Sequence, residues 1–249
     1  MNRYLYDGSV VGLLSAIARL LLDKVDAETA ILAPRRPTLF EEGFFLATDA
    51  ALAERLCLGL RRRAAEAAQY FSSALLAEQE GLESSLLRYT ALALRQGDQI
   101  NGHLTHPAVR EIVHLARRVG REIHRMKGLL RFEQLQDDSY LARMEPDHNI
   151  LQPLAAHFSQ RLRTQVWFIH DLRRHRLAYW DGETLQLGDV EHFTDPVLSA
   201  REHEVQDRWR AFFQSIAIPH RKNPRLQKSH MPMKYWKYLV ERPGGRHTD

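Results

Sequence analysis

The spacing of hydrophobic residues divides the chain into two parts near residue 128. Before that point, apolar side chains recur every three or four residues, which is the repeat of an α-helix with one buried face. This pattern predicts a helix over residues 10–23, two or three helices within residues 48–97, and a helix that starts at Pro107 and ends near residue 128. We therefore expect the first half to be mainly helical, after a short strand at residues 4–6.

Beyond residue 128 the apolar residues alternate with polar ones, which indicates strands with one buried face. Asp181 and Gly182 form a strong hairpin signal in this part. Helical spacing returns at residues 151–163, between two of the strands. The predicted strands cover residues 129–135, 140–145, 166–171, 176–180 and 184–187.

Two further helices are predicted toward the C-terminus. One covers about residues 199–216, with Trp209, Phe212 and Phe213 on its apolar side. The other opens at Pro232, because proline is tolerated in the first turn of a helix. Its inward residues are expected to be Met233, Trp236 and Leu239 or Val240, and its outward residues Lys234, Lys237 and Tyr238.

Together these patterns predict an α+β fold in a single domain of residues 1–249. A helical part of about residues 9–128 packs with a sheet part of about residues 129–190, which holds about five strands in antiparallel or mixed order. C-terminal helices and a basic tail follow over about residues 199–249. If the strand at residues 4–6 joins this sheet, the two parts form one domain. If it does not, the parts can be either one domain or two.

Composition and the first residues exclude several kinds of protein. Lys and Arg number 35 against 31 Asp and Glu, and the net charge is +4. Cys57 is the only cysteine, which excludes a disulfide within the chain and any cysteine-ligated cluster built from this chain alone. The apolar run at residues 10–22 is interrupted and too short to span a bilayer, and the first residues lack a signal-peptide layout. We expect a cytoplasmic protein without membrane contact.

No common cofactor motif is found. The sequence has no phosphate-binding glycine loop, dinucleotide fingerprint, nucleophile elbow or zinc-binding helix motif. No cofactor and no metal site are therefore identified from the sequence.

The helix that starts at Pro107 has a basic face opposite its apolar face. Glu111 and Glu122 lie only at the edge of that face. Like charges at helical spacing repel each other unless an anion or acidic groups elsewhere in the fold cover them, and the alternative is a solvated surface. The arginines of this face, called the arginine stripe below, are Arg110, Arg117, Arg118, Arg121 and Arg125.

Two more basic clusters follow along the chain. A predicted turn carries Arg173 and Arg174, and the last thirty residues interleave cations with aromatic rings. Cations neutralise phosphates and aromatic faces stack on bases, so the three basic features together favour nucleic acid over a solvated surface. The candidate residues of the tail are Arg221, Lys222, Arg225, Lys228, Lys234, Trp236 and Lys237.

Carboxylates and imidazoles cluster at the ends of two predicted strands. Such pairs orient an imidazole for proton transfer or bind a divalent cation. The competing interpretation is structural, with Asp147 or Asn149 as the cap of the following helix and the histidines as core residues. The candidate catalytic residues are Glu145, Asp147, His148, Asn149, His170 and Asp171.

An ordered set of short motifs resembles one bacterial family, whose members are assigned to DNA metabolism or DNA repair and carry a domain of unknown function. The motifs are residues 6–9 (Tyr-Asp-Gly-Ser), 115–122 (Leu-Ala-Arg-Arg-Val-Gly-Arg-Glu), 145–149 (Glu-Pro-Asp-His-Asn), 167–171 (Trp-Phe-Ile-His-Asp), 221–224 (Arg-Lys-Asn-Pro) and 235–237 (Tyr-Trp-Lys).

The resemblance implies a role in DNA metabolism. Members of the family accompany a radical SAM protein assigned to DNA modification or repair, and some are fused to a uracil-DNA glycosylase-like domain. The chain ends at Asp249 without such a domain, so no glycosylase activity is expected from it. The resemblance transfers no catalytic residues.

Three hypotheses follow. The first is a DNA-binding protein that acts as partner or adaptor of a radical SAM protein, with the arginine stripe and the basic tail as one surface for phosphates. The second is an enzyme that acts on DNA through the acid and histidine clusters. The third is an interaction protein whose basic faces contact only a protein partner.

Overall fold

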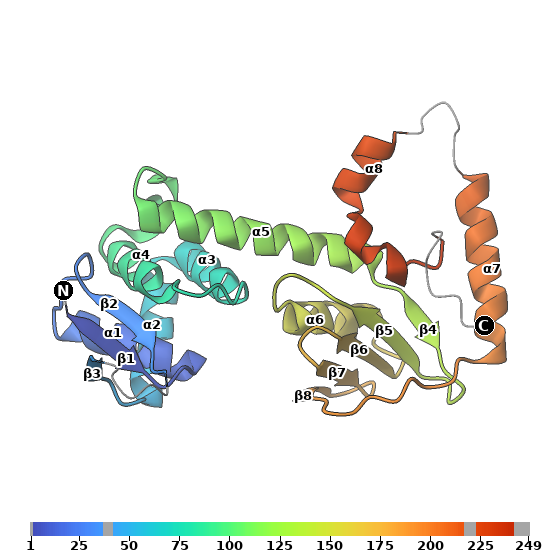
Figure 1. The fold of residues 1–249 in the computed structure, drawn as a ribbon, viewed down its shortest axis with the longest axis horizontal. Helices are drawn as coiled ribbons and strands as arrows, with labels where there is room; N and C mark the ends of the chain where they lie inside the picture. The colour runs from blue at the N-terminus through green and yellow to red at the C-terminus, as the bar shows by residue number, and fades with distance from the viewer. Residues whose placement is uncertain (1, 37–41, 217–222, 242–249) are drawn as a thin grey trace. The chain divides into compact units, whose positions relative to one another are not determined.

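The computed structural model describes residues 2–36, 42–216 and 223–241 (Figure 1). The chain forms two compact units, Met1–Gly120 and Arg121–Asp249. Helix α5 (Pro107–Leu129) contains residues of both. The assignment of the whole chain to a single domain stays a prediction, and the two units are described separately below.

The first unit contains helices and a small parallel sheet. Its strands follow the order β2-β1-β3, so strand β1 lies in this sheet and not in the larger one of the second unit. The predicted helices are confirmed, with three between residues 48 and 97. The elements are β1 (Arg3–Tyr6), α1 (Val10–Leu22), β2 (Ile31–Pro34), β3 (Phe44–Phe45), α2 (Ala50–Arg63), α3 (Ala65–Leu75), α4 (Glu83–Gln96) and η1 (Gly97–Gly102), followed by α5.

Local signals start two of these helices. The Ser9 hydroxyl accepts a hydrogen bond from the Gly12 N–H and caps α1. The Asp49 carboxylate caps α2 in the same way, by accepting from the N–H groups of Ala51 and Leu52. The apolar faces of the helices then pack into one core, in which Ile17 is completely buried.

The second unit is built on a five-stranded sheet of order β4-β5-β6-β7-β8. Neighbouring strands are antiparallel except β5 and β6, which are parallel and connected through helix α6 (Leu151–Arg161). The sheet is therefore mixed, and the predicted α+β class is confirmed. The strands are β4 (Phe132–Gln134), β5 (Tyr140–Met144), β6 (Trp167–Asp171), β7 (Arg176–Trp180) and β8 (Leu185–Asp189).

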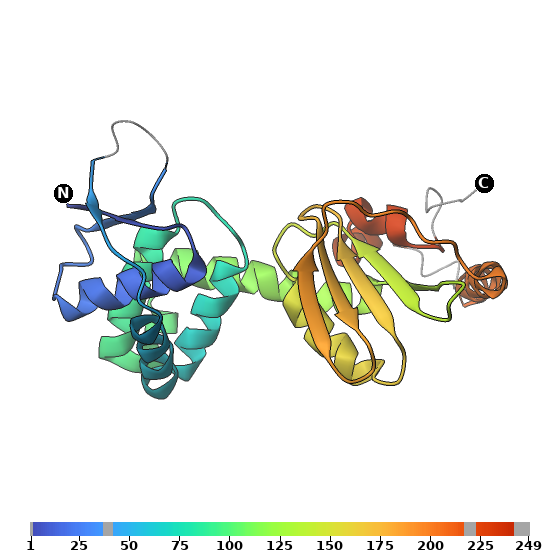
Figure 2. The same cartoon turned by 90° about the horizontal axis from the view of Figure 1, so that it is seen from below.

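Helix α6 covers one face of this sheet (Figure 2). Leu154 and Phe158 of the helix are buried together with Trp167, Ile169 and Ala178 of the sheet. These strand residues belong to one face, because side chains alternate between the two faces along a strand. The core of the second unit lies between α6 and the sheet.

The C-terminal part contains α7 (Ala200–Ser215), α8 (Pro224–His230) and the 3-10 helix η3 (Met233–Tyr238). The predicted facing of η3 is wrong for Met233, which is 57% exposed, and it omits Tyr235, which is buried. A 3-10 helix has about three residues per turn, so the face that carries Tyr235 differs from that of an α-helix started at the same residue. Leu239, which directly follows η3, is buried as predicted.

Candidate functional site

The buried carboxylate of Glu122 is the centre of the polar network in the second unit. Glu122 lies on α5 next to the buried residues Leu115 and Met126, seven residues before and four after it. The side chain of Glu122 is 5% exposed. The expectation that Glu122 lies at the edge of the basic stripe is therefore corrected: the residue belongs to the buried side of the helix.

Both oxygens of Glu122 accept hydrogen bonds from the segment after β5. Oε1 accepts from the Asp147 N–H at 2.8 Å, and Oε2 accepts from the His148 N–H at 3.0 Å. Nδ1 of the His148 ring lies 2.5 Å from Oε2. Because an ionised carboxylate has no proton to donate, Nδ1 carries the proton in this pair. The arrangement fixes the His148 ring and its tautomer.

Two residues of η3 complete the shell of Glu122. The hydroxyl of Tyr235 donates a short hydrogen bond to Oε1, and Nζ of Lys234 lies 3.3 Å from the same oxygen. The carboxylate therefore connects α5, the segment after β5 and η3, three parts of the second unit that are far apart in sequence.

These donors explain the acidity of Glu122. Burial by itself raises the pKa of a carboxyl group, since it disfavours the charged form. Hydrogen bonds from Tyr235, Asp147 and His148 outweigh the burial and lower the pKa of Glu122 from 4.5 to about 2. The pKa of Tyr235 is raised, first by burial and then by the hydrogen bond to Glu122. The carboxylate thus stays ionised at neutral pH.

An open pocket of about 670 Å³ lies beside this network, lined by charged residues and Met233. Lys234 forms a short ion pair with Asp147, and Nζ of Lys237 lies 2.7 Å from Oε2 of Glu145. Arg173 approaches the Asp147 carboxylate at 3.8 Å. The lining of the pocket therefore alternates in charge, and its cations and carboxylates partly neutralise each other.

The second predicted cluster, His170 and Asp171, is completely enclosed. Asp171 is 0% exposed, and burial raises its pKa while the nearby Arg174 opposes that shift. The His170 ring packs 4.3 Å from the Phe193 ring, centroid to centroid. Arg174 joins the two clusters, because it donates to Oδ2 of Asp171 at 3.3 Å and to the Asp147 carbonyl at 3.0 Å.

The predicted catalytic residues thus fall into two groups. Glu145, Asp147 and His148 meet at η3 and Glu122, whereas His170 and Asp171 are buried beneath the loop that carries Arg174. The interpretation of Asp147 or Asn149 as a helix cap is not supported, since α6 begins without a side-chain cap. Among the residues that the structure describes, no group of three or more His, Cys, Asp or Glu side chains is arranged to hold a metal ion.

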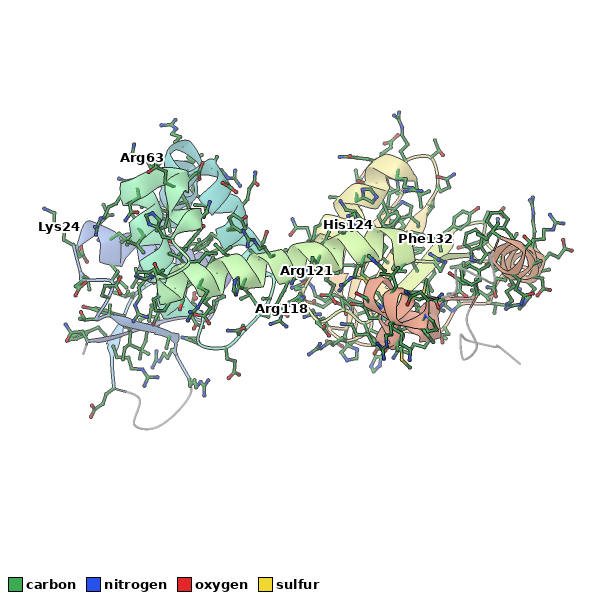
Figure 3. The ribbon with its side chains drawn as sticks, turned by 90° about the horizontal axis from the view of Figure 1, so that it is seen from above. Lys24, Arg63, Arg118, Arg121, His124 and Phe132 are labelled. Carbon is green, nitrogen blue, oxygen red and sulfur yellow. The ribbon has the colours of Figure 1, made fainter. Side chains whose placement is uncertain are left out.

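The arginine stripe lies on α5 (Figure 3 labels Arg118 and Arg121). Four of its five members are exposed, and Arg125 is half-buried. Within residues 2–36, 42–216 and 223–241, none of the five forms an ion pair with a carboxylate, so the stripe keeps its positive charge.

The other basic candidates are more varied. Arg225 and Lys228 are exposed on α8 and form no ion pair within the described part of the chain. Lys234 and Lys237 are instead paired with carboxylates, and the half-buried Trp236 donates its indole N–H to the Met231 carbonyl at 2.9 Å. Arg221 and Lys222 lie outside the described residues. The role of all these residues in nucleic-acid binding stays a prediction.

Comparison with known proteins identifies one family. A family model described as a domain of unknown function, DUF4130, matches residues 80–241. The chain belongs to this family. No curated protein and no solved structure matches the chain. The DUF4130 match covers Glu122, the segment after β5, and η3, so the whole Glu122 network lies inside the family domain.

Sequence reasoning missed Glu122 and Tyr235. The available signal for Glu122 was a carboxylate near the apolar face of a helix. Burying a charge without partners costs free energy, so a carboxylate there indicates hydrogen-bond donors around it. The signal for Tyr235 was weaker, since it depended on recognising a 3-10 helix rather than an α-helix. None of the described helices has the length and apolar character needed to cross a bilayer.

Proposed function

We propose that this protein is a cytoplasmic DNA-binding protein of DNA metabolism and acts as partner or adaptor of a radical SAM protein. The observation that carries the DNA-binding part is the arginine stripe of α5, whose guanidinium groups have no carboxylate partner among the described residues. The family resemblance given by the sequence motifs supports the radical SAM part.

The chemistry of the stripe suits a phosphate backbone. Guanidinium groups bind phosphate oxygens in a bidentate manner, and each neutralised phosphate releases condensed counter-ions. Arginines with three- and four-residue spacing present these groups on one side of helix α5. The exposed Arg225 and Lys228 of α8 add further cations, and Glu122 supports the proposal indirectly by holding η3 in place.

Salt dependence tests the DNA-binding part. We expect affinity for duplex DNA, measured by fluorescence anisotropy between about 50 and 200 mM salt, to fall linearly in a double-logarithmic plot. Replacing Arg117 and Arg121 with alanine should weaken binding and reduce the slope by about 0.9 per lost phosphate contact. Arg208→Ala is the matched control, because Arg208 is 78% exposed but already paired with Glu204. A salt-independent signal, or equal effects of all these variants, would contradict the proposal.

The Glu122–His148 pair favours a second candidate, an enzyme that acts on DNA. A buried carboxylate 2.5 Å from Nδ1 orients the ring, so that Nε2 keeps its lone pair as a possible proton acceptor. The open pocket lined by Glu145, Asp147 and Lys237 lies beside it. The test is turnover of modified DNA by the complex with the radical SAM protein: loss of product with His148→Gln and unchanged DNA affinity would favour the enzyme.

A further inference from the structure

Helix α7 buries two polar side chains and leaves large apolar side chains exposed. Val205, Trp209, Phe212 and Ile216 are 46%, 38%, 51% and 55% exposed, respectively. Glu202 and Gln206 of the same helix are each 6% exposed. An ordinary surface helix turns its apolar side toward the core, and α7 does not, although most of its charged residues are exposed as usual.

The buried polar side chains hold α7 on the sheet. Oε2 of Glu202 accepts from the Gln134 N–H of β4 at 2.9 Å, and Gln206 donates to Oε1 of Glu133 at 3.4 Å. Nε of Arg210 donates to the Val240 carbonyl at 3.0 Å, at the end of η3. These three side chains fix the side of α7 that faces the sheet, and this orientation leaves the apolar residues exposed.

The exposed apolar residues form a continuous stripe, called the α7 stripe below. Trp209 follows Val205 by four residues, Phe212 follows Trp209 by three, and Ile216 follows Phe212 by four. This is the repeat with which one helix packs along another. The guanidinium group of Arg131 packs over the Trp209 ring, 5.6 Å from its centroid, and helps to hold the ring in place. A fixed aromatic anchor within an exposed apolar patch is typical of a protein interface.

Arginines border the α7 stripe. Arg201 precedes Val205 by four residues, and Arg208 precedes Phe212 by four, so each lies beside a stripe residue on the next turn. Arg201 forms no ion pair within the described part of the chain, and the partner of Arg208, Glu204, is 70% exposed. The other acid nearby, Asp207, is paired with Arg210. Among the described residues the border thus keeps Arg201 as an unpaired cation, which favours a carboxylate on the molecule that covers the stripe.

We infer that the α7 stripe is a docking surface for an amphipathic helix of a partner protein, with apolar residues at three- and four-residue spacing and acidic residues beside them. This inference deepens the partner role in the proposed function and rests on it. It concerns protein binding only, because the arginine stripe of α5 is a separate set of residues.

A pair of synthetic peptides provides the test. The probe is a labelled amphipathic helix of about 18 residues with leucines at the spacing above and glutamates beside them, and the second peptide has lysines in place of the glutamates. We expect the full-length protein to bind the acidic peptide and to shift its tryptophan fluorescence, to which Trp209 contributes. Phe212→Glu should weaken this binding at least about tenfold. Leu58→Glu is the control, because Leu58 is 47% exposed on α2 of the first unit.

Three results would overturn the inference: no binding of the acidic peptide, equal binding of the basic peptide, or equal binding by Phe212→Glu. Self-association of the wild type that Phe212→Glu abolishes would also overturn it, by assigning the stripe to a second copy of the chain. DNA affinity measured on the same variant separates the two proposals. If Phe212→Glu binds DNA with the affinity of the wild type, the α7 stripe takes no part in DNA binding. The docking proposal can then fail without affecting the DNA-binding proposal.

Discussion

Glu122 shows how one buried charge organises a segment of this protein. Its carboxylate accepts hydrogen bonds from Asp147, His148 and Tyr235, which replace the water that it loses on burial. A carboxylate without these partners would shift toward its neutral form. Glu122 therefore has a structural role in the second unit.

The stability of the protein should depend on pH through Glu122. The pKa of Glu122 is about 2 in the folded protein and 4.5 ordinarily, so its contribution is fully present above pH 4.5 and is lost as the pH falls toward 2. The shift corresponds to at most about 3 kcal/mol. We expect the difference in free energy of unfolding between wild type and Glu122→Gln, measured by urea titration, to shrink between pH 6 and pH 3. Glu204→Gln, at a 70% exposed position, should show no such change.

At the scale of elements, two effects on stability oppose each other in α5: burial of apolar residues stabilises the helix, and repulsion between arginines destabilises it. Val109, Ile112 and Val113 of its apolar face are completely buried, while its arginine stripe gathers like charges. Arg121 has an arginine three residues before it, another four before it and a third four residues after it. Each such like-charge pair destabilises a helix by roughly 0.2–0.5 kcal/mol at low salt. The stripe thus lowers stability unless an anion covers it.

Replacing Arg121 with alanine should therefore raise stability and lower DNA affinity. We expect a gain of about 0.5–1 kcal/mol in free energy of unfolding at low salt, measured by denaturant titration, which disappears near 1 M salt because screening removes the repulsion. Arg208→Ala should show no gain, since Arg208 is paired with Glu204. A loss of stability at low salt would mean that Arg121 has an anionic partner within the protein.

At the scale of the whole molecule, the open question is cooperation between the two compact units. The four tryptophans, Trp167, Trp180, Trp209 and Trp236, all belong to the second unit. Tryptophan fluorescence therefore reports on that unit, while far-ultraviolet circular dichroism also reports on the helices of the first. The single-domain prediction requires that both signals change together.

We expect coincident urea transitions from these two probes, because α5 contributes buried residues to both units and unfolding of either removes part of its packing. Glu122→Gln should then move both transitions by the same amount. Separate midpoints, with only the fluorescence transition moved by Glu122→Gln, would show two independently folding domains and reject the single-domain prediction.

The sequence by itself determined most of the secondary structure and its order. Hydrophobic spacing and the start at Pro107 act within a few residues, so the longer helices and the strands of the five-stranded sheet were predictable from local pattern. The short elements β2, β3 and α8 were not predicted. The composition and the charge of the arginine stripe were equally visible.

Only the tertiary structure decided which polar residues meet. Glu122 and Tyr235 are more than a hundred residues apart in sequence, and no local periodicity encodes their hydrogen bond. The same holds for α7: its pattern predicted an apolar side but not that Glu202 would bind β4 and turn that side outward. Local spacing fixes which face of a helix is apolar, whereas the contacts available across the fold fix which face is buried.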